Sequence, residues 1–158
     1  SPAVHLDPTQ ALGATSLAAS DNWVFWADGA LIRVDTTSGG TTGTVTNVAD
    51  IARVAVGLSG VYAQRTTEVW RTAPDGSNPE LFIPNLTAVS NLSAQAGLVV
   101  ASDNKGSQGA ERVVGRGEQL PSERIYATAE GRVTAVSADA KYVYWADTAS
   151  GSIRRRAR

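Results

Sequence analysis

The sequence contains no cysteine and no methionine, and His5 is its one histidine. Without cysteine, the chain has no disulfide, no thiolate metal ligand and no thiol nucleophile. A Ser-His-Asp triad would require His5 beside a nucleophilic serine, and no recognisable nucleophile turn accompanies this histidine. A histidine metal site would require a second histidine or more. We therefore name no catalytic and no cofactor-binding residue.

Neither positive nor negative charge is in clear excess, because the 14 Lys and Arg residues nearly balance the 15 Asp and Glu residues. The net charge is -1. Such a chain has no overall field that would attract nucleic acid or an anionic membrane. Its apolar runs, such as residues 97–101, are far shorter than the roughly 20 residues of a membrane helix. We expect no nucleic-acid partner and no membrane insertion. The start at Ser1 and the lack of Met favour a mature or trimmed product.

What the sequence does contain is apolar alternation over short segments, separated by Gly, Ser, Thr, Asp and Asn. No window of 12 residues keeps a helical apolar stripe. Apolar residues make up 42% and charged residues 18% of the 158 residues, which suits one folded domain with its own core. The pattern predicts a single all-β domain over residues 1–158.

Four stretches share one arrangement of three short strands joined by turns, which predicts four repeats of about 37–42 residues. They cover residues 16–35, 53–72, 91–116 and 134–156. If Ala19, Val56, Ala94 and Val136 are equivalent, the intervals are 37, 38 and 42 residues. Counting from Val136 to the C-terminus and on from Ser1 to Ala19 gives 41 residues. This interval matches the other three, as expected if the four repeats form a closed ring.

A fourth extended stretch follows each of the first three repeats, at 42–49, 79–86 and 122–129, but none follows the last. Residues 2–8 form an unassigned stretch of the same kind. We predict a four-bladed β-propeller in which residues 2–8 complete the C-terminal blade by strand exchange, because this closure hides the edge strands. Such a ring would be a monomer. The alternative is a homodimer in which two chains form halves of a larger propeller.

Several segments resemble the YWTD repeat, also called the low-density-lipoprotein-receptor class B repeat, in its bacterial form. The aromatic-Trp-Ala-Asp motif occurs as WVFWAD and YVYWAD, followed by LIR and SGSIRR; a third likeness is the strand and DGSNP turn that include Asp75 and Gly76. The third repeat departs, with VVASD and an insertion at 104–111. The resemblance implies a propeller and an extracellular or cell-surface location. Propellers of this family usually have six blades, whereas this chain has four repeats. The resemblance therefore does not imply that this chain binds the partners of that family.

The repeated aromatic residues are interpreted as packing between blades. Trp26 and Trp145 alternate with Phe25 and Tyr144, so both faces of each strand carry a ring. A stacking platform for a sugar or a base is the alternative.

An aspartate recurs where the second strand of a repeat ends, as Asp28, Asp103 and Asp147, with Arg65 there in the second repeat. An aspartate at that position most often accepts hydrogen bonds from turn N–H groups. The alternative is a ring of carboxylates around the axis that holds Ca²⁺, which takes six to eight oxygen ligands. These residues are therefore weak metal candidates.

Arginine recurs in the third strand, as Arg33, Arg71 and Arg155, and each is expected to bridge to an acidic or carbonyl group of its own or the next blade. The end of the chain, residues 152–158, carries four arginines. Strand alternation explains most of this charge, and a basic binding patch is the alternative.

The leading functional hypothesis is a non-enzymatic module that binds a protein or a carbohydrate through loops on one face of a rigid propeller. A second hypothesis is a propeller lyase or hydrolase that uses axial carboxylates and a divalent metal. A third is a structural domain of a larger secreted assembly. The ligand itself does not follow from the sequence.

Overall fold

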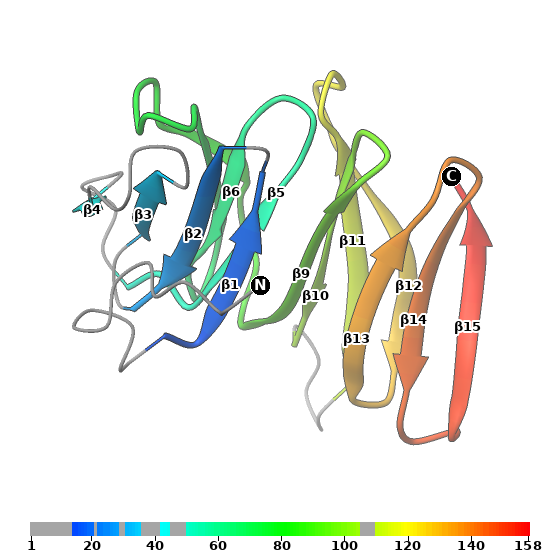
Figure 1. The fold of residues 1–158 in the computed structure, drawn as a ribbon. Helices are drawn as coiled ribbons and strands as arrows, with labels where there is room; N and C mark the ends of the chain where they lie inside the picture. Colours follow the sequence, from blue (N-terminus) through cyan, green and yellow to red (C-terminus); the bar gives the residue numbers. More distant parts are fainter. Residues whose placement is uncertain (1–13, 21, 29–30, 36–41, 45–49, 105–109) are drawn as a thin grey trace, which may run out of the picture.

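A computed structural model describes residues 14–20, 22–28, 31–35, 42–44, 50–104 and 110–158 of the chain. Within these ranges the regular structure is β only, arranged as four antiparallel sheets (Figure 1). No helix in this part of the chain is long and apolar enough to cross a membrane. The all-β prediction is confirmed, and the fold is propeller-like.

The sheets follow the chain in order, and each is a simple up-and-down meander. The first comprises β1 (Ser16–Ala19), β2 (Trp23–Ala27), β3 (Leu31–Asp35) and β4 (Thr42–Thr44). The second comprises β5 (Arg53–Val56), β6 (Val61–Gln64), β7 (Val69–Thr72) and β8 (Glu80–Ile83). The third comprises β9 (Val89–Gln95), β10 (Leu98–Asp103), β11 (Glu111–Gly117) and β12 (Glu123–Glu130). The fourth comprises β13 (Val133–Ala138), β14 (Tyr142–Asp147) and β15 (Ser152–Ala157).

Turn chemistry explains why the strands reverse where they do. Ala96 and Gly97, the two residues between β9 and β10, both have positive φ, of 50° and 73°, as a tight type I′ hairpin requires. Between β13 and β14, the Asp139 carboxylate accepts hydrogen bonds from the N–H groups of Lys141 and Tyr142, both at 2.7 Å. These short-range bonds fix the register of each hairpin.

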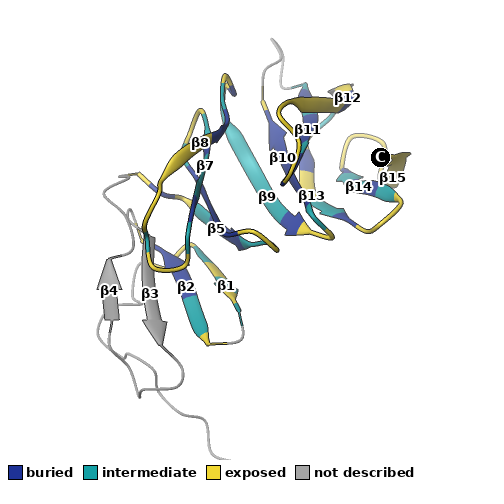
Figure 2. Cartoon of the chain, turned by 90° about the horizontal axis from the view of Figure 1, so that it is seen from above, coloured by how far each residue is buried: buried dark blue, intermediate teal, exposed yellow. Residues whose placement is uncertain are grey.

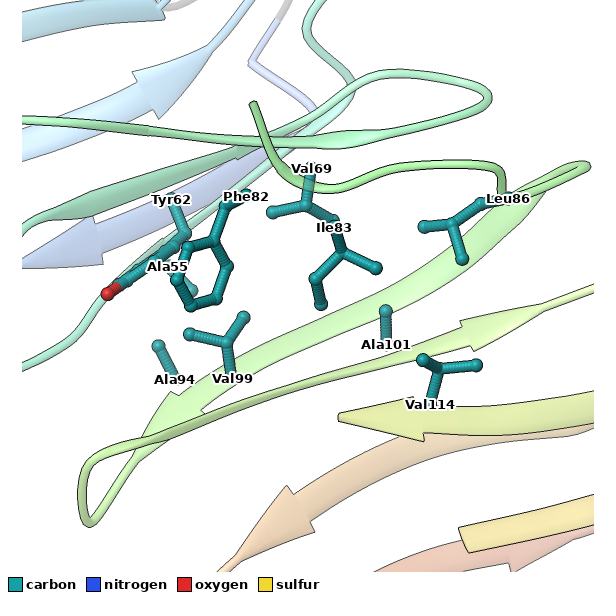
Figure 3. Packing of buried hydrophobic residues seen from close by; sticks show 10 residues of the cluster. All are labelled: Ala55, Tyr62, Val69, Phe82, Ile83, Leu86, Ala94, Val99, Ala101 and Val114. Carbon is teal, nitrogen blue, oxygen red and sulfur yellow. The ribbon is translucent and has the colours of Figure 1, made fainter. Parts of the chain in front are cut away.

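Each sheet has a trailing face, turned to the next sheet along the chain, and a leading face, turned to the sheet before it. Strand alternation assigns the faces: Tyr62 packs in the core between the second and third sheets, whereas Val61 and Ala63 pack toward the first. Three apolar cores lie between successive sheets (Figure 2). The middle core has the large rings of Tyr62 and Phe82 in an edge contact at 5.0 Å (Figure 3).

The four sheets fan out along an open arc, with β1, β5, β9 and β13 innermost (Figures 1 and 2). The first and fourth sheets lie at the two ends of this arc. The last repeat supplies three strands to the fourth sheet among the described residues, as predicted for that repeat. Residues 2–8, the predicted closing strand, lie outside the described residues, so closure within one chain stays a prediction.

The strand register changes one detail of the predicted repeat. Ala19, Val56 and Ala94 stand opposite Val24, Val61 and Val99 in the first three sheets. In the fourth sheet, the counterpart of Val99 is Val143, and it pairs with Ala138 rather than with Val136. The choice of Val136 as the equivalent position was therefore wrong by two residues, because spacing alone does not fix which strand residues face each other.

Candidate functional site

A polar hollow opens on one edge of the sheets, at the mouth of the interface between the second and third sheets. Its lining combines one carboxylate, one guanidinium, two amides and two hydroxyls. These groups come from strands β7 and β8 and from the β5–β6, β7–β8 and β11–β12 turns. The lining residues are Ser59, Arg71, Thr72, Ala73, Asn78, Glu80 and Gln119. Such mixed donors and acceptors suit hydrogen bonding to a polar loop or to sugar hydroxyls.

Arg71 crosses this hollow and links the two sheets. Its guanidinium binds the Glu80 carboxylate at 2.5 Å in its own sheet, and donates to the backbone oxygen of Glu118 in the third sheet at 3.1 Å. It also lies over the Phe82 ring, 5.4 Å from the centroid. The recurring arginine was expected to bridge to an acidic or carbonyl group of its own or the next sheet, and Arg71 contacts one of each.

Glu118 binds the turn of the neighbouring sheet from behind the hollow. The residue is 5% exposed, and its two carboxylate oxygens accept hydrogen bonds from the N–H groups of Leu58 at 3.0 Å and Ser59 at 2.7 Å. A Cβ at Gly57 would lie 2.0 Å from Glu118 Oε1, so a larger residue there would displace this carboxylate from its present position. The β5–β6 turn is therefore held in place by a carboxylate about 60 residues further along the chain.

The hydroxyl groups beside the hollow are arranged for bonding rather than for nucleophilic attack. Ser59 Oγ lies 3.0 Å from the Tyr62 hydroxyl and 3.4 Å from Arg71 Nη1. Burial raises the pKa of Tyr62, so its hydroxyl keeps its proton at neutral pH. Neither neighbour is a base that would take the Ser59 proton.

The predicted aspartate positions lie on the opposite edge of the sheets, and Asp103 and Asp147 each have local partners of their own. Asp103 is fully buried, and it accepts bonds from the N–H groups of Thr87 (2.6 Å) and Ala88 (3.0 Å) and from Arg112 Nε (2.6 Å). Asp103 therefore binds the backbone of the segment that precedes β9, and not the turn that follows its own strand, β10. Asp28 is exposed.

Asp147 does bind its own turn. It accepts bonds from Ser150 Oγ at 2.6 Å and Ala149 N–H at 3.0 Å, and it pairs with Arg154 at 3.2 Å. The Ser150 hydrogen bond lowers the pKa of Asp147. Arg65, which replaces the aspartate in the second sheet, pairs with Glu68 at 2.6 Å. Across the residues described, no three His, Cys, Asp or Glu side chains gather as a metal would require.

The remaining motif residues serve the fold. Trp145 is 6% exposed in the core between the third and fourth sheets, and Trp26 is 4% exposed in the first sheet. Asp75 accepts bonds from Ser77 N–H and Ser77 Oγ in the turn where Gly76 has a φ of 86°. The Arg33 side chain, His5 and residues 105–109 of the insertion lie outside the described residues.

The arginines near the C-terminus are mostly engaged within the molecule. Arg156 donates to the Tyr126 oxygen at 2.7 Å, and Arg158 donates to the oxygens of Ala96 and Asp139, both at 2.9 Å. Arg155 stands over the Tyr142 ring, 4.6 Å from its centroid. Because side chains alternate along the strand, neighbouring arginines lie on opposite faces of the sheet and have different partners.

Sequence reasoning singled out Arg71 but missed Ser59, Glu80, Glu118 and Gln119. Glu118 and Arg71 are far apart in the sequence and meet only because the third sheet packs on the second. The one sequence signal was the recurring arginine, whose need for a partner implied an acceptor on the next sheet.

No family model and no curated protein matches the sequence. Among solved structures, the computationally designed Ika4 protein has a TM-score of 0.72 at 18% identity, over 99% of this chain and 98% of that chain. A nidogen/laminin complex gives 0.63 at 13%, over 91% of this chain and 75% of that chain. The designed Ika8 protein gives 0.65 at 17%, over 91% and 45% respectively. These identities support the propeller-like fold alone.

Proposed function

We propose that this chain is a non-enzymatic scaffold that binds a protein or carbohydrate at the polar hollow between the second and third sheets. The observation that carries the proposal is the cross-sheet bonding of Glu118 with the β5–β6 turn, beside Arg71. A turn fixed in this way is pre-organised, so binding orders few further groups. A nidogen/laminin structure among the neighbours gives one example of such a fold in a protein complex.

The test is a screen of the full chain on protein and glycan arrays, with matched variants. Glu80→Gln and Gln119→Ala change the hollow, whereas Asn104→Ala changes an exposed residue on the opposite edge of the sheets. We expect at least one class of array ligand to bind, to lose about tenfold in affinity (about 1.4 kcal/mol) with the hollow variants, and to bind the control unchanged. Equal binding by all variants, or no binding together with turnover of a substrate, would overturn the proposal.

The competing enzyme hypothesis rests on the aspartates at the ends of β2, β10 and β14. The separate local partners of Asp103 and Asp147 favour a structural role for these two. Elemental analysis of the purified chain decides between the two. A stoichiometric divalent ion that Asp103→Asn and Asp147→Asn each release would favour the enzyme, and a scaffold requires no such ion.

The proposed setting is outside the cell, as part of a secreted or cell-surface assembly of bacterial origin. It rests on the resemblance of the aromatic-Trp-Ala-Asp segments to YWTD repeats. The proposal for the hollow does not depend on it.

A further inference from the structure

The two ends of the arc present faces that are covered everywhere else in the molecule. Phe25, Tyr62 and Val100 occupy one register position on the trailing faces of the first three sheets, and all three are fully buried against the next sheet. Tyr144 occupies the same position in the fourth sheet, opposite Ser137 as Val100 is opposite Ser93. No fifth sheet follows among the described residues, so Tyr144 faces outward.

The trailing face of the fourth sheet is an apolar hollow. It lies between β13, β14 and β15 and includes Ala135, Tyr144, Ala146 and Ile153. Ile153 is 80% exposed. A large aliphatic side chain that exposed, beside a tyrosine and two alanines, is typical of a surface that another protein surface covers.

The leading face of the first sheet is the matching surface. Val54, Leu92 and Val136 share one register position on the leading faces of the later sheets, and each packs against the sheet before it. Leu17 holds that position in the first sheet, opposite Trp26, and it is 69% exposed. Trp26 on the same face is already buried, so the exposed apolar surface of this face lies at Leu17.

We propose that the trailing face of the fourth sheet binds the leading face of the first sheet of a second copy, so that two copies join head to tail into one ring. The three internal interfaces show what covers a trailing face in this chain: the leading face of a like sheet. The end sheets of one copy stand at opposite ends of the arc, so each needs a sheet from elsewhere (Figures 1 and 2). Contacts of this head-to-tail kind close when the rotation between copies completes a circle.

Arg155 would add a polar contact to the proposed interface between the fourth sheet and the first sheet of the second copy. It pairs in register with Tyr144, as Arg71 pairs with Tyr62. Arg71 donates to a backbone oxygen of the following sheet, and Arg155 is positioned to do so on the incoming one. The arc of this chain also superposes on less than half of the Ika8 chain, which leaves more than half of that chain beyond it.

The first test is the mass in solution by light scattering over a range of concentrations. We expect about twice the chain mass of 16.4 kDa at high concentration. Ile153→Arg and Leu17→Arg should each weaken the dimer at least about tenfold, since either buries a charge in an apolar contact. Leu58→Arg is the control, because Leu58 is 83% exposed on a turn away from both end faces. A mass of 16.4 kDa at every concentration would overturn the proposal.

Mixing the two variants distinguishes a head-to-tail ring from a face-to-face dimer. A mixed dimer of Ile153→Arg with Leu17→Arg keeps one undamaged interface, so the mixture should associate more tightly than either variant alone. A face-to-face dimer would instead leave Leu17→Arg or Ile153→Arg fully dimeric, and that result contradicts the proposal. Circular dichroism of each variant confirms that its strands are intact.

Cross-linking separates a two-copy ring from closure within one chain. The natural sequence has no cysteine, so a Leu17→Cys, Ile153→Cys double variant reacts with a bismaleimide only at these two positions. The proposal predicts a cross-linked dimer on a denaturing gel. A cross-linked monomer would show that the chain closes on itself and would overturn the proposal, while the proposed binding at the polar hollow would be unaffected.

Discussion

Tyr62 and Tyr144 occupy the same register position in the second and fourth sheets, yet their surroundings differ. Tyr62 is fully buried against the third sheet, with Phe82 packed edge-on at 5.0 Å. Tyr144 is only half-buried, and its hydroxyl donates to Asp139 at 2.7 Å. The neighbouring sheet, and not the strand's own sequence, therefore decides whether a ring at this position is part of a core.

Removing each ring in turn tests this difference most directly. Tyr62→Ala should lower the free energy of unfolding by about 3–5 kcal/mol, because it leaves a large cavity in a packed interface. Tyr144→Ala should lower it by less than about 1 kcal/mol in dilute solution, where the face is open to water. Urea unfolding measures both.

Protein concentration should also affect the two variants differently. If two copies join as proposed, the effect of Tyr144→Ala should grow as the protein is concentrated, whereas the effect of Tyr62→Ala should not change. A large effect of Tyr144→Ala even in dilute solution would mean that its face is already covered in the monomer.

The next largest effect is expected at the other edge of the same interface. Asp103→Ala should destabilise the fold by about 3 kcal/mol, because Arg112 is then left with a mostly buried charge and two N–H groups lose their acceptor. Asp28→Ala, at the same repeat position but exposed, should change the unfolding free energy by no more than about 0.5 kcal/mol. Equal effects at both positions would contradict the assignment of Asp103 to the interface between sheets.

A smaller effect is expected for the carboxylate that fixes the β5–β6 turn. Glu118→Ala removes the acceptor of the Leu58 and Ser59 N–H groups and should cost about 1–3 kcal/mol. Gln119→Ala changes the adjacent, exposed residue and should stay within about 0.5 kcal/mol. Hydrogen exchange of the Leu58 and Ser59 amides, which should accelerate only in the Glu118 variant, locates the change.

The sequence predicts the sheets better than it predicts the contacts between them. Alternation and turn residues depend on neighbours a few positions apart, so the four successive sheets, and the three strands that the last repeat supplies among the described residues, could be inferred. The predicted stretch at 79–86 contains β8, and the one at 122–129 overlaps β12.

Contacts across sheets depend on how the sheets stack, and a single sequence does not encode that locally. The pairing of Glu118 with the β5–β6 turn was therefore missed. The same limit explains why Asp103 was interpreted as a cap of its own turn when it binds the connector at Thr87 and Ala88.

The smallest expected effect concerns pH and the fourth sheet. The hydrogen bond from Ser150 lowers the pKa of Asp147 in the folded state below its value in the unfolded chain. Its stabilising contribution is therefore complete above the unfolded pKa, near pH 4, and is lost as the pH falls through the folded pKa. Asp147→Asn should flatten the decline of the urea midpoint as the pH falls below about 4.

Ser150→Ala is the matched variant for this measurement, because it keeps the carboxylate and removes the main cause of the shift. It should flatten the same acid limb in part, since the Ala149 N–H and Arg154 still favour the charged form. If Ser150→Ala leaves the acid limb as steep as in the natural chain, the turn bond does not set the pKa of Asp147. The fourth sheet would then owe its acid sensitivity to another carboxylate, with Asp139 beside Tyr144 the first to test, because its pKa is also lowered by hydrogen bonding.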